Sequence, residues 1–367
     1  MRRAGVPYMP QLDGLRAFAV SAVLVHHLMP ASVWPDVLGA VSWGQYGVRL
    51  FFVLSGFLIT GLLIQATSGA AIARGAVMKQ FYIRRALRIF PIYYLVLGAA
   101  FVLRPPDVPE QLPWLATYTY NFWISYLGWY PGYFAHFWTL CVEEQFYLLW
   151  PWLLVFAPRR YAYAGALAMV VASPVFRALA IGYELNEVAY YTLTPASLDA
   201  LGLGALLALH TRGEPAAPGV ERRLRTVALP LALIGVVACL WSKSVHDVFY
   251  DTFVALAFLW LVAAASHGFR RAPGRVLEAP PVLYLGRISY GVYVYHLVIQ
   301  GLWKIDPVAL GVTGRTGDLL AFAIYCAATI AVASLSWFAL ERPINRLKNR
   351  WAAAPGSSPI ALAPGKS

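Results

Sequence analysis

Charged residues and cysteines are scarce in this sequence. Only 13% of the 367 residues are charged, whereas 60% are apolar. Such a composition excludes an ordinary water-soluble globular domain and indicates that lipid is the solvent. The three cysteines, Cys141, Cys239 and Cys326, all lie within apolar segments, which excludes a disulfide framework and offers no metal-ligand pattern. We therefore expect no metal, and we assign the cysteines to the packed interior.

Most of the sequence consists of long apolar runs. Most runs have roughly 17 to 22 residues, enough for an α-helix to cross a hydrocarbon core of about 30 Å. The first run carries Asp13 and Arg16 and is followed by no small-residue cleavage site, so we expect it to remain in the mature protein. Eleven runs can be drawn, at 12–30, 46–65, 89–103, 112–127, 134–157, 161–181, 193–210, 226–242, 250–266, 283–303 and 319–340.

The run 112–127 differs from the others. Polar residues such as Asn121 and Ser125 interrupt it, and the turn-forming Gly128 and Pro131 follow it. This pattern is typical of an interfacial or partly inserted segment. We therefore expect that this run does not cross the membrane.

Basic residues indicate how the chain is oriented. If run 112–127 does not cross the membrane, six clusters of Lys and Arg lie on one side of it. The loops on the other side then hold only Arg104, Lys243, Lys304 and Arg315. Lys and Arg accumulate in the cytoplasmic loops of membrane proteins. The sequence therefore predicts an all-α polytopic protein of the inner (plasma) membrane, with about ten transmembrane helices and both termini cytoplasmic.

Two classes of partner can be assessed from the same features. The net charge of +12 could suggest nucleic acid, but the positive residues lie in short loops and not on one amphipathic face, so no nucleic-acid partner is expected. No internal repeat relates the two halves, which disfavours a transporter built on inverted repeats. We expect one transmembrane domain in contact with membrane lipid over residues 1–350. A disordered cytoplasmic tail, rich in Ala, Pro, Gly and Ser, is expected over 351–367.

Ionisable residues within the first run are candidate functional residues, because lipid tolerates them only when they are paired or face a wet cavity. Arg16 and His27 are eleven residues apart, so they share one helical face with a rise of about 16 Å between them. Asp13 can pair with Arg16, three residues later. The alternative is that Arg16 marks the inner end of the span, while backbone carbonyls satisfy His26 and His27.

Two adjacent carboxylates, Glu143 and Glu144, interrupt the run 134–157. Carboxylates inside an apolar helix have few purely structural roles. Glu143 and Tyr147 are one turn apart and can face the same space, whereas Glu144 points about 100° away. We therefore take Glu143 as the stronger functional candidate.

Three arginines, Arg84, Arg85 and Arg88, lie ahead of the third span. Their cytoplasmic position alone can explain them. The alternative is that three guanidiniums at the mouth of a cavity bind the phosphates of a donor that arrives from the cytoplasm.

A stripe of hydrogen-bonding groups lies in the run 283–303. Ser289, Tyr293 and His296 are spaced i, i+4 and i+7, so they lie along one side of a helix. Such a stripe either joins helices or lines a site, and the sequence leaves both readings open.

Seven sequence motifs occur in a recognisable order between about residue 10 and residue 345. They are LDGLRA from Leu12, His27, GVRLFFVLSGFLI from Gly47, RRALR from Arg84, VEEQFY from Val142, RISYGVYVYH from Arg287 and ERP from Glu341. Their order resembles the acyltransferase 3 family of bacterial membrane O-acyltransferases. Many members carry an acid where this chain has Arg49. Some also append a soluble hydrolase-like domain, which is not seen here, so we expect a stand-alone transmembrane module.

The resemblance implies ten helices, a cytoplasmic acyl-coenzyme A donor, usually acetyl-coenzyme A, and an acceptor hydroxyl on a glycan, a lipid-linked saccharide or an antibiotic sugar. Arg16 and His27 match the family's arginine–histidine pair, and Glu143 matches its first acidic position. As a hypothesis, His27 acts as general base and Glu143 holds its tautomer, with direct transfer and a transient acyl-histidine both open. The residues expected to bind donor or acceptor are Asp13, Arg16, Arg84, Arg85, Arg88, Arg287, Ser289, Tyr290, Tyr293 and His296.

Other functions remain open from the sequence. A cell-envelope or exported polysaccharide is the first choice of acceptor, and a secreted small molecule of the macrolide type is the second. A transporter or flippase for a polar lipid or glycan would also place charges inside the membrane. A non-catalytic membrane partner is the third class.

Overall fold

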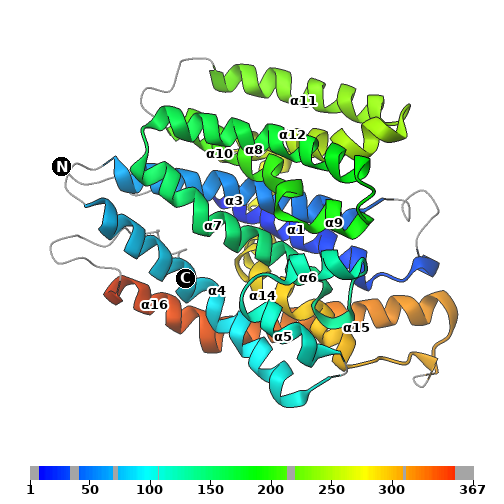
Figure 1. Cartoon of the computed structure of the whole chain (residues 1–367). Helices are drawn as coiled ribbons and strands as arrows, with labels where there is room; N and C mark the ends of the chain where they lie inside the picture. The colour runs from blue at the N-terminus through cyan, green and yellow to red at the C-terminus, as the bar shows by residue number, and fades with distance from the viewer. Residues whose placement is uncertain are drawn as a thin grey trace.

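The protein is described here from a computed structural model, over residues 8–33, 41–68, 73–105, 107–212, 220–308 and 311–351. Every regular element in these ranges is helical. Figure 1 shows long helices lying roughly side by side, with the short helices α5 (Val108–Ala116), α6 (Tyr120–Leu127) and α9 (Glu187–Thr192) toward one end of the bundle and the short α16 (Arg342–Trp351) on the other side. The expectation of an all-α protein is confirmed. The tail over 352–367 lies outside the described residues.

Ten helices in the described ranges have 15 or more residues. They are α1 (Pro10–Leu28), α3 (Trp43–Thr67), α4 (Arg74–Leu103), α7 (Trp138–Phe156), α8 (Arg159–Gly182), α10 (Leu198–Arg212), α11 (Val220–Cys239), α12 (Lys243–His267), α14 (Pro280–Leu302) and α15 (Gly314–Ser336). Six helices are long and apolar enough to cross a membrane. These six are α3, α4, α8, α12, α14 and the continuous helix Gly314–Arg346, which begins with α15.

The remaining elements are short. They are the α-helices α5 (Val108–Ala116), α6 (Tyr120–Leu127), α9 (Glu187–Thr192), α13 (Arg271–Leu277) and α16 (Arg342–Trp351), the 3-10 helices η1 (Ala31–Val33), η2 (Gly132–Phe137) and η3 (Thr194–Ser197), and the π-helix η5 (Trp337–Glu341). The doubtful run 112–127 thus forms parts of α5 and α6. Since they have 9 and 8 residues, neither can span a bilayer, which takes about 20 residues.

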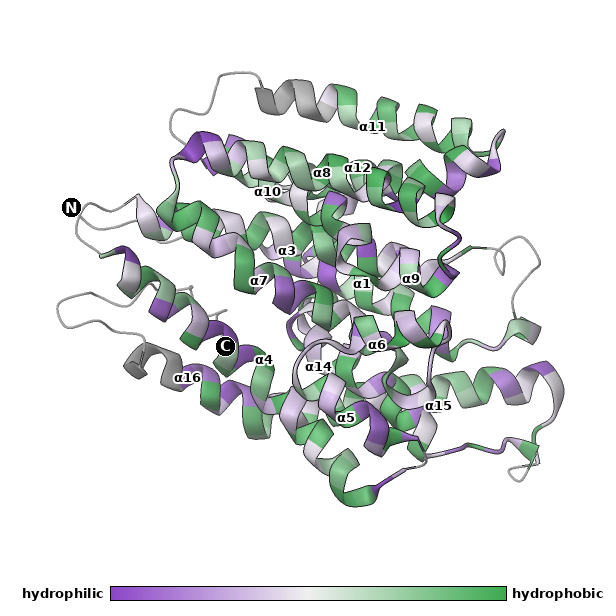
Figure 2. Ribbon diagram, viewed as in Figure 1, coloured by the Kyte–Doolittle hydropathy of each residue, from purple (hydrophilic) through white to green (hydrophobic). Residues whose placement is uncertain are grey.

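Large apolar side chains cover the outer faces of the long helices. Val102, Leu149, Ile234 and Leu335 are between 68% and 76% exposed. Exposed apolar surface on this scale suits a hydrocarbon solvent and not water. Figure 2 shows hydrophobic colour along most of the long helices. The protein is therefore a multi-pass membrane protein, as the sequence predicts.

Close backbone contacts hold the centre of the bundle together, where α1 packs on α3 and α14, and α3 packs on α10. A Cβ atom at Gly56 would lie 2.1 Å from the carbonyl oxygen of Leu201, and one at Gly286 would lie 2.0 Å from that of Asp13. Small residues at helix crossings allow this approach in membrane proteins. The glycines thus allow α3 to approach α10 and α14 to approach α1.

Candidate functional site

A cavity of about 90 Å³ lies inside the bundle, between α1, α3, α4, α7 and α14. Five helices that are far apart in the sequence contribute its walls. The polar side chains that line it are Arg16, Ser55, Arg85, Arg88, Thr139, Glu143, Glu144, Tyr147, Ser289, Tyr290 and Tyr293. The cavity therefore brings together members of all four groups of candidate residues.

Arginines form the basic part of the cavity. Arg16 is paired with Asp13, with 2.7 Å between nitrogen and oxygen, as the sequence predicts. Outside the span, burial and the charge of Asp13 raise the pKa of Tyr8 to about 12, so that its hydroxyl remains a donor to Asp13. Arg85 lies over the ring of Tyr147, 4.9 Å from the centroid.

Arg85 and Arg88 remain available for an anion. Neither makes an ion pair within 4.0 Å in the described part of the chain. Planar guanidiniums bind phosphates and carboxylates with two parallel hydrogen bonds. This side of the cavity can therefore bind an anionic group.

Two carboxylates face the arginines. The Ser55 hydroxyl donates to Glu143 Oε1 at 2.6 Å, and the Tyr147 hydroxyl donates to Ser55 at 3.0 Å. Glu143 and Tyr147 thus share one space, as predicted. Glu144 also lines the cavity, although helical geometry placed it about 100° away. Its Oε1 is buried and has no hydrogen-bond partner among the described residues, so both acids belong to the cavity wall.

The hydroxyl groups of α14 mainly join helices. The Tyr290 hydroxyl donates to the Ile89 carbonyl oxygen of α4 at 2.9 Å. The Tyr293 hydroxyl donates to the His136 carbonyl oxygen of η2 at 2.8 Å. Ser289 donates to the carbonyl oxygen of Gly286 in its own helix. These side chains line the cavity and also fix its shape.

A cluster of histidines lies next to Tyr293. The Nε2 atom of His296 lies 3.2 Å from the Nδ1 atom of His27, which also lies 3.2 Å from the carbonyl oxygen of Val23. The ring of His136 lies 4.4 Å from that of His296. His296 and His136 are buried, whereas His27 is partly exposed.

Hydrogen bonding defines the tautomer of His27. His296 Nδ1 lies 2.6 Å from the Tyr293 carbonyl oxygen, so in a neutral ring it carries the proton and its Nε2 is an acceptor. His27 Nδ1 then faces two acceptors, on His296 and Val23, and must carry the proton of its own ring. Within the described residues, the Nε2 atom of His27 thus keeps a lone pair that no hydrogen bond uses, as a general base or nucleophile requires.

The structure does not show the expected contact between Glu143 and His27. Glu143 accepts from Ser55, and His27 is held by Val23 and His296. Along α1, the rise of about 16 Å between Arg16 and His27 puts the cavity lining and the histidine at different depths. The tautomer is therefore set by an imidazole and a backbone carbonyl.

Several predicted residues do not line the cavity. Asp13 pairs with Arg16. His296 lies beside Tyr293, and His27 lies beside His296. Arg287 is exposed. Arg84 is half-buried, and its Nε has no hydrogen-bond partner among the described residues. The cavity thus retains two of the three clustered arginines.

Three residues of this region were missed as candidates: Ser55, Thr139 and His136. Glu144 was considered but ranked below Glu143, although it also lines the cavity. The hydroxyl of Thr139 lies 2.5 Å from that of Tyr293. The Nδ1 atom of His136 is buried and has no hydrogen-bond partner in the part of the chain that the structure describes. The short hydroxyl side chains carry no signal in an apolar run. His136, three residues before Thr139, could have been found as a histidine at the entry of a span that contains two acids.

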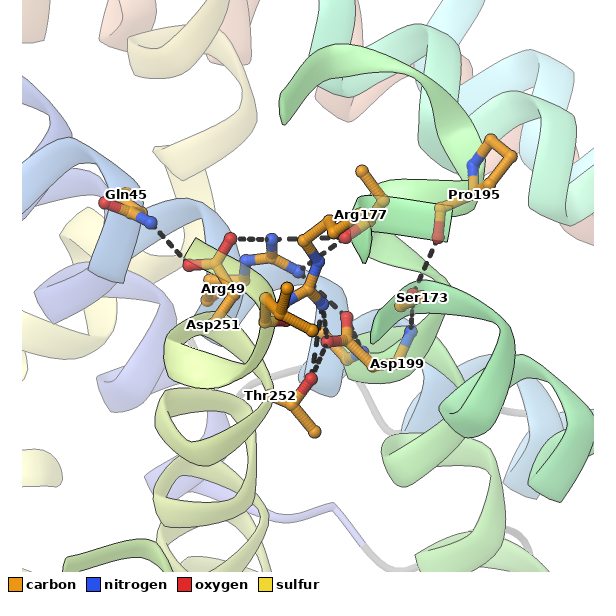
Figure 3. A network of polar contacts seen from close by, with 11 residues as sticks. Gln45, Arg49, Ser173, Arg177, Pro195, Asp199, Asp251 and Thr252 are labelled. Atoms are coloured by element: carbon orange, nitrogen blue, oxygen red, sulfur yellow. Dashed lines mark hydrogen bonds and ion pairs between the residues drawn. The ribbon is translucent and has the colours of Figure 1, made fainter. Parts of the chain in front are cut away.

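A second polar network explains the unusual Arg49. This buried side chain pairs with Asp199 of α10 at 2.9 Å and with Asp251 of α12. Arg177 of α8 pairs with the other oxygen of Asp199, and Thr252 donates to it (Figure 3). Two guanidiniums thus neutralise two carboxylates, and Arg49 has a structural role that joins α3 to α8, α10 and α12.

In the described part of the chain, no cluster of three or more His, Cys, Asp or Glu side chains could hold a metal ion. The geometry defines a multi-pass helical membrane protein with a charged cavity inside its bundle, beside a histidine with a free ring nitrogen. Comparison with known families is more specific. The chain belongs to the acyltransferase family whose model, described as an acyltransferase domain, matches residues 9–338.

Several curated proteins are similar to this chain. It is 30% identical to the peptidoglycan O-acetyltransferase OatA of Listeria monocytogenes, 28% identical to the putative peptidoglycan O-acetyltransferase YrhL of Bacillus subtilis, and 27% identical to the putative O-acetyltransferase SAS0844 of Staphylococcus aureus. Each alignment covers 92% of this chain but only 56%, 55% and 58% of the respective relative. The chain thus spans little more than half the length of these relatives. No solved structure matches it significantly.

Proposed function

We propose that this protein is a membrane O-acyltransferase. It would transfer an acyl group, most simply acetyl, from acyl-coenzyme A to a hydroxyl of a saccharide in the cell envelope. The observation that carries the proposal is the convergence of Arg16, Arg85, Arg88, Glu143 and Glu144 in one membrane cavity, next to the histidine cluster. Membership of the acyltransferase family and similarity to proteins named O-acetyltransferases support it.

The arginines would bind the donor. Arg85 and Arg88 have no ion-pair partner in the described residues, and Arg16 retains donors beyond the one that Asp13 accepts. Coenzyme A carries several phosphates at one end and its thioester at the end of an extended arm. Phosphates at the arginines would let this arm reach along the cavity toward Tyr293 and His27.

His27 would activate the acceptor. Its free Nε2 takes the proton of the acceptor hydroxyl as the oxygen attacks the thioester carbonyl carbon. The carbon–sulfur bond breaks, and the proton passes from the imidazolium to the leaving thiolate, which gives free coenzyme A. The same lone pair could attack the thioester first and form an acyl-histidine. Mass spectrometry after incubation with donor alone distinguishes the routes, since only the second adds one acyl group to the protein.

Ten membrane helices with both termini cytoplasmic complete the proposal. The ten long helices correspond to the ten runs other than 112–127, and this orientation puts the arginines of α4 toward the cytoplasm, where the donor is made. His27, near the end of α1, would lie toward the opposite face. The acyl group would thus be passed from a cytoplasmic donor to an acceptor at the outer face.

The acceptor is proposed to be a polymer of the cell wall, because two of the similar proteins are named peptidoglycan O-acetyltransferases, one of them as putative. The test is the release of free thiol from acetyl-coenzyme A by the purified protein, with and without extracted wall glycans. Release that depends on glycan supports the enzyme. Acetyl-coenzyme A left intact with every glycan, alongside folded protein, would favour a transporter of polar lipid or glycan instead.

A further inference from the structure

A second cavity lies between α4, α14, α15 and the π-helix η5. Its volume is about 580 Å³, within the range of roughly 300–1,000 Å³ that is usual for ligand sites. None of its lining residues lines the arginine-rich cavity. Its walls belong to three of the six helices that are long and apolar enough to cross a membrane. The cavity is therefore enclosed by helices that have the length and composition of membrane spans.

The walls of this cavity are apolar. No charged side chain lines it, and its polar side chains are Tyr133, Tyr295 and Ser336. The Tyr295 hydroxyl donates to Ser336 at 3.0 Å, so these two groups bond to each other. Water or a polar ligand would find too few partners here. An empty space of this size would forfeit the close packing of protein interiors, so hydrocarbon is the chemistry that fits.

The cavity opens toward the surrounding lipid. Leu103, Leu302 and Leu335 line it and are 62%, 51% and 69% exposed. A hydrocarbon chain can therefore enter sideways between the helices, without leaving the bilayer.

Two basic side chains, those of Arg104 and Lys304, lie near one end of the cavity. Leu103 and Leu302 are the last residues of α4 and α14, and Arg104 and Lys304 follow them closely. Both basic side chains are exposed, and neither has an ion-pair partner within 4.0 Å in the described residues. Nearby Asp306 instead accepts from the backbone N–H of Val308 at 3.0 Å. Positive charge just beyond an apolar chain site complements a lipid with an anionic headgroup.

We propose that this cavity binds one anionic phospholipid. One acyl chain of the lipid would lie between α4, α14 and η5, and its phosphate would lie near Arg104 and Lys304. This inference does not depend on the proposed reaction. The lipid site and the proposed reaction site share α14, because this helix also carries Tyr293 and His296. A bound lipid would therefore hold the helix that forms one wall of the reaction site.

Native mass spectrometry tests the proposal on the full chain, released from nanodiscs that contain equal amounts of phosphatidylglycerol and phosphatidylcholine. The wild type should retain one phosphatidylglycerol per chain. Val298→Trp, which fills the cavity, should lose it. Leu148→Trp adds the same side chain at a lipid-exposed position of α7 outside the cavity and should retain it.

A second variant leaves the cavity walls intact. Arg104→Ala combined with Lys304→Ala should reduce the preference for phosphatidylglycerol over phosphatidylcholine by roughly tenfold. Lys243→Ala, which removes an exposed cation elsewhere, should keep that preference. The same lipid retention in Val298→Trp as in wild type, or no headgroup preference in wild type, would overturn the proposal. Retention of a lipid of another class by mass would overturn the phospholipid assignment.

Discussion

The proposed role of His27 depends on the two acceptors around one of its ring nitrogens. Val23 and His296 both accept from Nδ1, at 3.2 Å each, which leaves Nε2 free. The sequence predicted the histidine but assigned its partner to Glu143. Contacts between α1 and α14 depend on how the two helices are rotated against each other, and no spacing within either helix contains that information.

Replacement of His296 by Phe should lower kcat for acyl transfer by roughly three- to tenfold, because one of two hydrogen bonds that fix the His27 tautomer is lost. The KM for the donor should stay the same, since the buried His296 does not line the cavity. Steady-state kinetics measures both constants. His210→Phe, on α10, is the matched control. A raised KM with unchanged kcat would return His296 to the substrate-binding role that its sequence stripe first suggested.

Removal of the Arg88 guanidinium should mainly weaken donor binding. One lost charge-assisted hydrogen bond costs about 1.5–3 kcal/mol, so Arg88→Ala should raise the KM for acyl-coenzyme A by roughly tenfold or more. Arg287→Ala removes an exposed arginine outside the cavity and serves as the control. If both variants keep the wild-type KM, the Arg88 side chain serves only membrane orientation.

At the scale of elements, apolar length and polar interruptions predicted most of the fold. The run 112–127 was separated from the spans because of its polar residues, and it forms two short helices. The network around Arg49 could not be predicted. Its partners Asp199 and Asp251 lie 150 and 202 positions away in the sequence, and nothing in α3 indicates that α10 and α12 pack beside it.

The Arg49 network should be a large contributor to stability. Arg49→Leu leaves Asp251 without its ion-pair partner and removes one partner of Asp199, and such an uncompensated buried charge costs about 3–5 kcal/mol. Thermal unfolding in detergent should show a markedly lower Tm. Arg49→Leu combined with Asp251→Asn should recover part of the loss, because the second change removes the stranded charge. A Tm equal to wild type in the single variant would contradict the structural role.

For the whole molecule, the charges of the loops predict on which side of the membrane each end of a helix lies. In a chain whose three native cysteines are replaced by Ser, Lys243→Cys should react with a membrane-impermeant maleimide on intact cells. Arg160→Cys should react only after the cells are opened, since it lies at the cytoplasmic start of α8 in the proposed topology. Labelling with the opposite pattern would reverse the orientation and place the arginines of the cavity away from the cytoplasmic donor.

Acyl transfer through His27 is the claim on which the function depends. The most direct measurement follows labelled acetyl from acetyl-coenzyme A onto wall glycan, with purified wild type, His27→Ala and His210→Ala. Loss of a general base lowers rates by about 10²–10⁴-fold, so His27→Ala should fall by that factor, while His210→Ala should match wild type. Labelled glycan formed by folded His27→Ala at the wild-type rate would contradict the assignment of His27 as the base.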